Sequence, residues 1–278
     1  MTAWPGHPRV PDLPLPPRGY RPPRGHTDVW TLHTSPATVQ AARRLHNTLD
    51  VPERRRVEAA PSQEAGNAYL VGRVALRLVL GACLDVRPRS VPLLRAPCPL
   101  CQGRHGRPVV GVTADLHFSV SRRRNTVVLA LAATPVGIDL GTPDRITPDV
   151  AGRLHPAERA AVRRLPEDLR EQALLHCLVR KGAYLKSVGT GSGVPPSTVD
   201  IGPGPDFGGA DPQPAPYALT TLAAPPGYAA ATALLLPSAR GARTRPTVDR
   251  YGCDACGTAA ARPGTESPAD AAVAALTP

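Results

Sequence analysis

The stretch Leu178-Val-Arg-Lys-Gly-Ala-Tyr-Leu-Lys-Ser-Val-Gly-Thr-Gly191 contains the only two lysines of the chain, Lys181 and Lys186. The other 31 of the 33 basic residues are arginine. Lysine is a compact, strongly hydrated point charge that the planar guanidinium of arginine does not replace. Two lysines on one predicted helix therefore indicate a site that needs them, although chance survival on a solvated helix face would give the same pattern.

The stretch belongs to a predicted helix over residues 168–188, which a glycine at position 189 ends. By apolar spacing we expect further helices from residue 36 and over residues 64–84 and 156–165. We expect strands over residues 28–34, 109–110, 116–121, 126–132, 135–140, 197–202, 217–223 and 228–236. This order predicts an α/β (α+β) fold of two pseudo-symmetric halves, each with a small sheet and packed helices.

Composition divides the chain into four parts. Its 278 residues, 42% of them hydrophobic, are enough to bury a core. Residues 1–26 have frequent prolines and no apolar periodicity, which predicts a disordered, mobile arm. We expect the first half of the fold over residues 27–134 and the second half over residues 135–237. Residues 238–278 are rich in Ala, Pro, Arg and Gly and predict a disordered tail.

Hydropathy and charge limit the function classes. No apolar run approaches the ~18–20 residues of a membrane span, and the N-terminus lacks the pattern of a signal peptide, so we expect a soluble, cytoplasmic protein. The net charge of +11 favours anionic partners. Basic runs at residues 54–56 and 122–124 would suit nucleic acid, but no groove-reading motif accompanies them, so we expect no nucleic-acid partner.

Three segments combine into a known pattern: His117-Phe-Ser-Val-Ser-Arg-Arg-Arg-Asn125, Val136-Gly-Ile-Asp-Leu-Gly141 and the lysine stretch 178–191. Gly106-Arg-Pro108 and Leu154-His-Pro-Ala-Glu-Arg159 extend it. Their order and spacing over residues 28–236 resemble the 4′-phosphopantetheinyl transferase superfamily, in its larger monomeric type with two pseudo-symmetric halves. Both lysines fall on lysine positions of that family, which removes most of the weight from the chance interpretation.

The resemblance implies transfer of the phosphopantetheine arm of coenzyme A to a serine of an acyl or peptidyl carrier protein in secondary metabolism. It implies Asp139 as a magnesium ligand and Lys181 and Lys186 as residues that hold the cofactor phosphates. Coenzyme-binding positions fall on Arg107, Ser121, Arg122 and Lys186. Arg73 and Arg77 join this set because they share one face of the predicted helix 64–84.

The acidic side of the family pattern is missing. Gly141 and Gly182 stand where the family has two metal-binding glutamates, so Asp139 alone would hold magnesium weakly. A displaced carboxylate could replace each glutamate, with these candidates: Asp144 or Asp149 for the first loss, Glu171 or Asp115 for the second. The chain could instead reuse the cleft, without metal, to bind or act on a thioester linked to a carrier protein or coenzyme A. It could also serve only to bind a partner, or be decaying toward no function.

The six cysteines offer two further hypotheses. Cys177 would be a candidate nucleophile if it faced the cleft, although a Cys in Leu174-Leu-His-Cys-Leu178 is more often a buried helix residue. Two Cys-x-x-Cys pairs could together bind a structural zinc ion, and the alternative is two unrelated thiol pairs in loops. The four thiols are those of Cys98, Cys101, Cys253 and Cys256.

Overall fold

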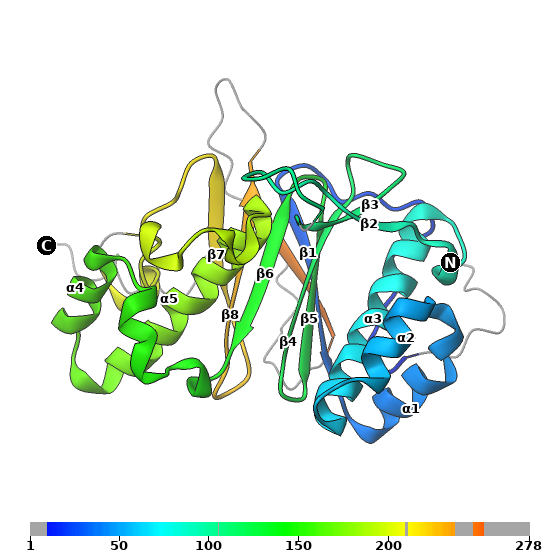
Figure 1. Ribbon diagram of the computed structural model, residues 1–278, viewed down its shortest axis with the longest axis horizontal. Coiled ribbons are helices and arrows are strands. Elements are labelled where there is room, and N and C mark those ends of the chain that lie inside the picture. Colours follow the sequence, from blue (N-terminus) through cyan, green and yellow to red (C-terminus); the bar gives the residue numbers. More distant parts are fainter. Residues whose placement is uncertain (1–9, 105, 209–210, 237–246, 253–278) are drawn as a thin grey trace, which may run out of the picture.

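The structure, a computed structural model, describes residues 10–104, 106–208, 211–236 and 247–252 (Figure 1). Within these residues, strands occupy the centre and helices cover both outer sides, with α1, α2 and α3 on one side and α4 and α5 on the other. The expected fold class, a mixed α/β protein of two similar halves, is confirmed.

The first half joins a sheet of order β4-β5-β1-β9 to three helices. Strand β9 runs parallel to β1, and the other neighbours are antiparallel. A two-stranded ladder of β2 and β3 lies beside them. The elements are β1 (His26–His33), α1 (Pro36–Arg44), α2 (Val51–Glu58), α3 (Gln63–Leu84), β2 (Leu93–Arg95), β3 (Pro108–Val110), β4 (His117–Arg123), β5 (Thr126–Ala132) and β9 (Thr247–Gly252).

The second half repeats the order of one strand, then helices, then two antiparallel strands. Its antiparallel sheet has the order β6-β8-β7, with the last strand of the half in the middle, just as β5 lies between β1 and β4. The elements are β6 (Val136–Gly141), α4 (Pro156–Arg164), α5 (Glu167–Val188), β7 (Tyr217–Leu222) and β8 (Ala229–Leu235). Gly189 ends α5 with a left-handed backbone (φ 90°), as its position predicts.

Alternating side chains build the layers, because successive residues of a strand face opposite sides. In β1, Trp30 and Leu32 pack with the helices of the first half, whereas Val29 joins the apolar layer between the two sheets. In β6, Val136, Ile138 and Leu140 belong to that same layer. The opposite face of the second sheet packs on α5. The core therefore has four layers, in the order helices, sheet, sheet, helices.

The described parts of the two termini differ from the expected disorder. Residues 10–25 pack on the first half: Val10 is buried, the indole of Trp30 donates to the carbonyl of Pro14 at 2.8 Å, and Arg21 donates to that of Cys83. Residues 247–252, inside the expected tail, form β9 beside β1.

Further differences concern single elements. The apolar spacing of the sequence does not predict helix α2. The expected strand at 197–202 is wrong: residues 196–198 form a 3₁₀ turn, and the amides of Ile201 and Gly202 donate to the carboxylate of Glu158 instead of to a neighbouring strand. Helix α3 is long and apolar enough to cross a membrane by length and composition, contrary to expectation, but 72% of its most apolar window is buried inside the fold, as in the core helix of a soluble protein.

Candidate functional site

A face of small residues on β6 lets α5 approach the strand closely. This face alternates Gly137, Asp139 and Gly141, while the intervening apolar residues point to the other layer. A Cβ at position 137 would overlap the carbonyl oxygen of Ala183 in α5, so only glycine allows this contact. The close approach brings Lys186 of α5 to Asp139.

Asp139 is the centre of a polar cluster. The residue itself is buried, with 6% of its surface exposed. Its Oδ1 accepts from Ser121 Oγ of β4 at 2.8 Å and from Lys186 Nζ at 2.7 Å. Its Oδ2 accepts from Arg145 Nη1 at 2.7 Å. Burial raises the pKa of the Asp139 carboxyl, but Lys186 and Arg145 outweigh it and hold the pKa below its usual value. Asp139 is therefore a stably ionised carboxylate with two cationic partners.

Arg145 is the residue of this cluster that sequence reasoning missed. It follows Asp139 by six residues, at the end of a 3₁₀ turn (Pro143–Arg145) that leads the chain back over the end of β6. In an arginine-rich chain, one arginine in a short turn carries no signal of its own. Only the fold shows that it reaches the carboxylate.

The two glycines at the family glutamate positions lie against this cluster. A Cβ at position 182 would overlap Oδ2 of Asp139. A Cβ at position 141 would lie 2.7 Å from Cγ1 of Val179, 2.9 Å from Cδ1 of Leu175 and 3.2 Å from Cδ of Arg145. Neighbouring side chains therefore fill the space beside both glycines, so the lack of a side chain at these positions does not widen a cleft.

None of the four displaced carboxylates contacts Asp139. Asp144 pairs with Arg123 and Arg124, and Asp149 accepts from Thr147. Asp115 accepts from Thr113, and Glu171 is exposed on α5. The described residues contain no group of three or more His, Cys, Asp or Glu side chains that could hold a metal ion.

Lys181 lies apart from Lys186. Its Nζ contacts Oε2 of Glu158 at 2.8 Å, with both side chains almost fully buried, and donates to the carbonyls of Pro196 (2.8 Å) and Val199. It therefore joins α4, α5 and the chain after α5. Its assignment to the cofactor phosphates stays a prediction.

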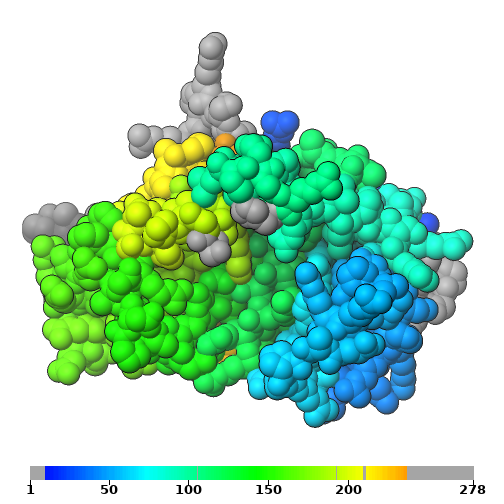
Figure 2. Space-filling view, in the orientation of Figure 1, coloured from blue at the N-terminus to red at the C-terminus, as the bar shows by residue number. Residues whose placement is uncertain are grey.

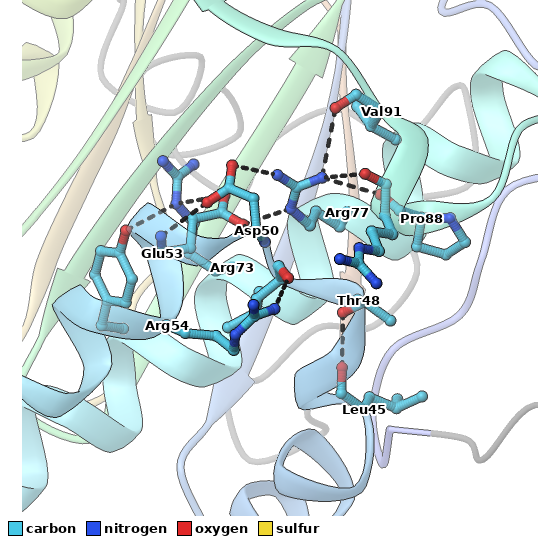
Figure 3. A network of polar contacts seen from close by, with 12 residues as sticks. Leu45, Thr48, Asp50, Glu53, Arg54, Arg73, Arg77, Pro88 and Val91 are labelled. Atoms are coloured by element: carbon cyan, nitrogen blue, oxygen red, sulfur yellow. Dashed lines mark hydrogen bonds and ion pairs between the residues drawn. The ribbon is translucent and has the colours of Figure 1, made fainter.

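Arg77 has a similar environment in the first half (Figure 3). Its Nε contacts Glu53 at 2.6 Å, its Nη2 contacts Asp50 at 2.9 Å, and its Nη1 donates to the Pro88 carbonyl at 3.1 Å. Arg77 is only 2% exposed. Arg73 shares the same helix face, as predicted, because it also pairs with Glu53, at 3.4 Å.

An arginine cluster lies around Tyr69 in the first half. Arg122 of β4 lies 4.8 Å from the Tyr69 ring centroid, and Arg73 lies 5.7 Å from it. Partial burial, together with the charges of Arg73 and Arg56, lowers the pKa of Arg122, although part of its side chain is exposed. Within the described residues Arg122 has no ion pair. A cavity of about 600 Å³ is lined by Arg56, Tyr69 and Arg73.

The segment that contains β2 and β3 reaches from the first half to the second, and Figure 2 shows it (turquoise) next to the green and yellow surface of the second half. There Arg107 Nη1 donates to the carbonyl of Ser187 at 3.4 Å. Its Nε is buried with no hydrogen-bond partner among the described residues. Burial lowers the pKa of Arg107.

The cysteines take different environments. Cys177 is fully buried, and burial raises the pKa of its thiol to about 12, so the interpretation as a core residue is confirmed. Cys98 is buried and Cys101 is exposed. Cys253 and Cys256 lie outside the described residues, so the zinc site stays a prediction.

No protein-family model matches the chain. Over 92 residues it is 27% identical to a 4′-phosphopantetheinyl transferase of Bacillus subtilis. The match covers 33% of this chain and 41% of that protein's length, so it spans well under half of either. This similarity suggests a distant relation to phosphopantetheinyl transferases.

Proposed function

We propose that the protein binds coenzyme A and transfers its phosphopantetheine arm to a serine of an acyl or peptidyl carrier protein. The observation that carries the proposal is that Ser121 and Lys186 both donate to Oδ1 of Asp139, at 2.8 and 2.7 Å. These residues come from β4, β6 and α5, and the resemblance assigns all three to one cofactor site. The distant similarity to a phosphopantetheinyl transferase supports the same activity.

The arginine cluster supports an anionic ligand that extends from this site. Arg122 follows Ser121 in β4, and their side chains point to opposite faces of the strand. Because β4 is an edge strand, a ligand that runs along its edge can contact both faces. Arg56, Arg73 and Arg122 would hold the phosphate of the adenosine part, and cation–π contacts with the Tyr69 ring help to position Arg73 and Arg122.

The family uses magnesium, but the residues of this chain do not fit a magnesium site. Asp139 is the only carboxylate of the described cluster, and its oxygens already accept from Ser121, Lys186 and Arg145. Magnesium takes carboxylate, phosphate and water oxygens in a near-octahedral arrangement. A cation placed at Asp139 would meet two positive charges instead of further oxygen ligands.

In the proposed reaction, the serine hydroxyl releases its proton to solvent and its oxygen bonds to the pantetheine-side phosphorus, while the phosphoanhydride bond breaks and adenosine 3′,5′-bisphosphate leaves. Lys186 is placed to stabilise negative charge on the phosphates. Asp139 is a poor base for the serine proton, because two cations hold it ionised and its pKa low. We assign no base among the described residues.

The alternative, a cleft reused for thioester chemistry, is not favoured. Its candidate nucleophile, Cys177, is fully buried, and burial raises the pKa of the thiol to about 12. We include in the proposal a carrier protein as partner, a cytoplasmic location and action as a monomer.

Intact-mass spectrometry of a panel of apo carrier proteins, incubated with this protein and coenzyme A, tests the proposal. We expect a carrier to gain the phosphopantetheine mass with the wild type and with the exposed-site control Glu171→Gln. Asp139→Asn and Lys186→Met should abolish the gain. If no carrier gains mass with the wild type, the transferase activity is excluded for that panel and the proposal fails for those carriers.

A further inference from the structure

The guanidinium of Arg145 lies at the carboxylate where a metal ion would be needed, and several contacts fix it there. Its Nη1 contacts Oδ2 of Asp139 at 2.7 Å and the carbonyl of Leu140 at 3.4 Å. Lys186 Nζ holds the other carboxylate oxygen at 2.7 Å and donates to the Ile138 carbonyl at 2.9 Å. Both oxygens of Asp139 therefore have a cationic partner.

The glycines at positions 141 and 182 are the steric condition for this arrangement. The carboxylate of Asp139 occupies the space that a side chain at position 182 would need. The Arg145 stem comes within 3.2 Å of the place where a Cβ at position 141 would lie. Both departures from the family pattern therefore accommodate the same group, an arginine bound to the aspartate.

The charges of the cluster favour an anion over a cation. One carboxylate and two cations leave one net positive charge before any ligand binds. Arg145 and Lys186 keep 19% and 36% of their side chains exposed, whereas Asp139 keeps 8%. Among the described residues, only Asp139 and Leu140 accept hydrogen bonds from the guanidinium of Arg145, both through Nη1. Nη2 and Nε are left for a ligand, and a guanidinium fork suits phosphate oxygens.

We propose that Arg145 and Lys186 bind the pyrophosphate of the substrate directly, so that the site holds coenzyme A without a divalent cation. The identity of the ligand rests on the proposed function; the independence from metal rests on the Arg145–Asp139–Lys186 cluster. Arg145 supplies planar, paired donors and Lys186 supplies a point charge. Asp139 acts as the positioning residue that fixes both cations.

Isothermal titration calorimetry with coenzyme A tests the proposal in buffer with EDTA and in buffer with excess magnesium. We expect the wild type to bind equally well in both. Arg145→Gln should weaken binding about 10- to 100-fold, the value of a lost charged hydrogen-bond pair. Arg145→Lys should recover part of the loss. The matched control Arg164→Gln, which removes an exposed charge from α4 of the same half, should bind like the wild type.

Three contrary results would distinguish a failure of the metal-independent binding site from a failure of the proposed transferase function. Wild-type binding that EDTA abolishes would overturn the metal-independent site and leave the proposed transferase standing. Arg145→Gln binding as tightly as the wild type would exclude Arg145 as a pyrophosphate ligand. No coenzyme A binding by the wild type in either buffer would refute the proposed function itself.

A second experiment measures metal binding by the wild type, so its expected result does not depend on whether a variant folds. Mn²⁺ alone, titrated into the wild type and followed by electron paramagnetic resonance, should remain in its free form, because two cations already neutralise Asp139. Mn²⁺ bound at the wild type and released by Asp139→Asn would show a metal site at this carboxylate and would overturn the proposal.

Discussion

Each half contains a buried carboxylate–cation pair, and the two pairs occupy corresponding positions. In the first half, Glu53 stands at the third position of α2 in a capping box and pairs with Arg77. In the second half, Glu158 stands at the third position of α4 in a capping box and pairs with Lys181. Both cations lie fourteen residues after the first residue of a 22-residue helix. We call each set a clamp: the Glu53–Arg77 clamp and the Glu158–Lys181 clamp.

Both clamps also hold the chain that follows the long helix. Arg77 donates to the carbonyls of Pro88, Arg89 and Val91, part of which Figure 3 shows. Lys181 donates to the carbonyls of Pro196 and Val199. Arg77 in α3 and Lys181 in α5 therefore each stabilise the fold of their own half. A structural clamp accounts for Lys181 without a substrate.

The halves differ where the long helix meets its sheet. In the first half this contact is apolar, with Trp30, Leu129 and Val74 in one buried cluster. In the second half it contains three glycines, at positions 137, 141 and 182, and the ionised Asp139, to which Lys186 and Arg145 bind. The polar cluster is the feature that the second half adds to the common plan, and it is the site of the proposed function.

The largest expected effect comes from breaking a clamp. Glu158→Ala leaves Lys181 buried without its partner and removes the acceptor of the Ile201 and Gly202 amides, so it should lower the free energy of unfolding by about 3–5 kcal/mol. Glu53→Ala should cost a similar amount. Urea denaturation measures both, with Glu171→Ala as an exposed control expected within about 0.5 kcal/mol of the wild type. A negligible loss for Glu158→Ala alone would show that the clamps are not equivalent.

The Asp139 cluster should contribute less than a clamp, since its cations are partly exposed and screened by solvent. Asp139→Asn should lower the free energy of unfolding by about 2 kcal/mol at pH 7. Because the folded pKa of Asp139 lies below its unfolded value, near 4, the contribution is present above about pH 4 and is lost as pH falls through the folded pKa. Denaturation from pH 7 to pH 2 should show the two proteins converge in acid. A difference that grows toward acid pH would contradict the assigned ion pairs.

Gly182 lies at the contact between α5 and its sheet, where the second half has a polar cluster and the first half has apolar side chains. Gly182→Ala places a Cβ on the Asp139 carboxylate and should cost about 1–3 kcal/mol through overpacking, despite the better helix propensity of alanine. Thermal unfolding measures the loss. Gly152→Ala is the control, because a Cβ there meets nothing within 4 Å. If both variants unfold alike, position 182 has room that the proposed cluster does not allow.

The smallest expected effect concerns one buried cysteine in each half, because neither thiol should react. Cys83 of α3 and Cys177 of α5 are fully buried, and burial raises the pKa of each thiol to about 12. At pH 8 roughly one in 10⁴ of such thiols is ionised. Iodoacetamide followed by peptide mass spectrometry should therefore label the exposed Cys101 first and leave both buried thiols unlabelled in the native state. Early labelling of Cys177 would reopen its role as a nucleophile.

Local signals in the sequence specify the elements and part of the site. Apolar spacing and capping residues predict β1, α3, β5 and α5 to within two residues, because these signals involve only near neighbours in the chain. The family resemblance implies that Asp139 and Lys186 belong to one cofactor site, and the structure brings these two residues into contact.

Which cation meets which carboxylate depends on the packing of the layers. The fold separates Lys181 from Lys186, joins Arg145 to Asp139, and pairs Arg77 with Glu53. Neighbouring positions on one helix point in different directions, so five residues of spacing can place two lysines against different layers. Partners across layers depend on how closely the layers pack, which glycines on β6 and α5 set. Arg77 and Glu53 are 24 positions apart, and Arg145, only six residues after Asp139, reaches it because a 3₁₀ turn leads the chain back, so no local pattern contains these contacts.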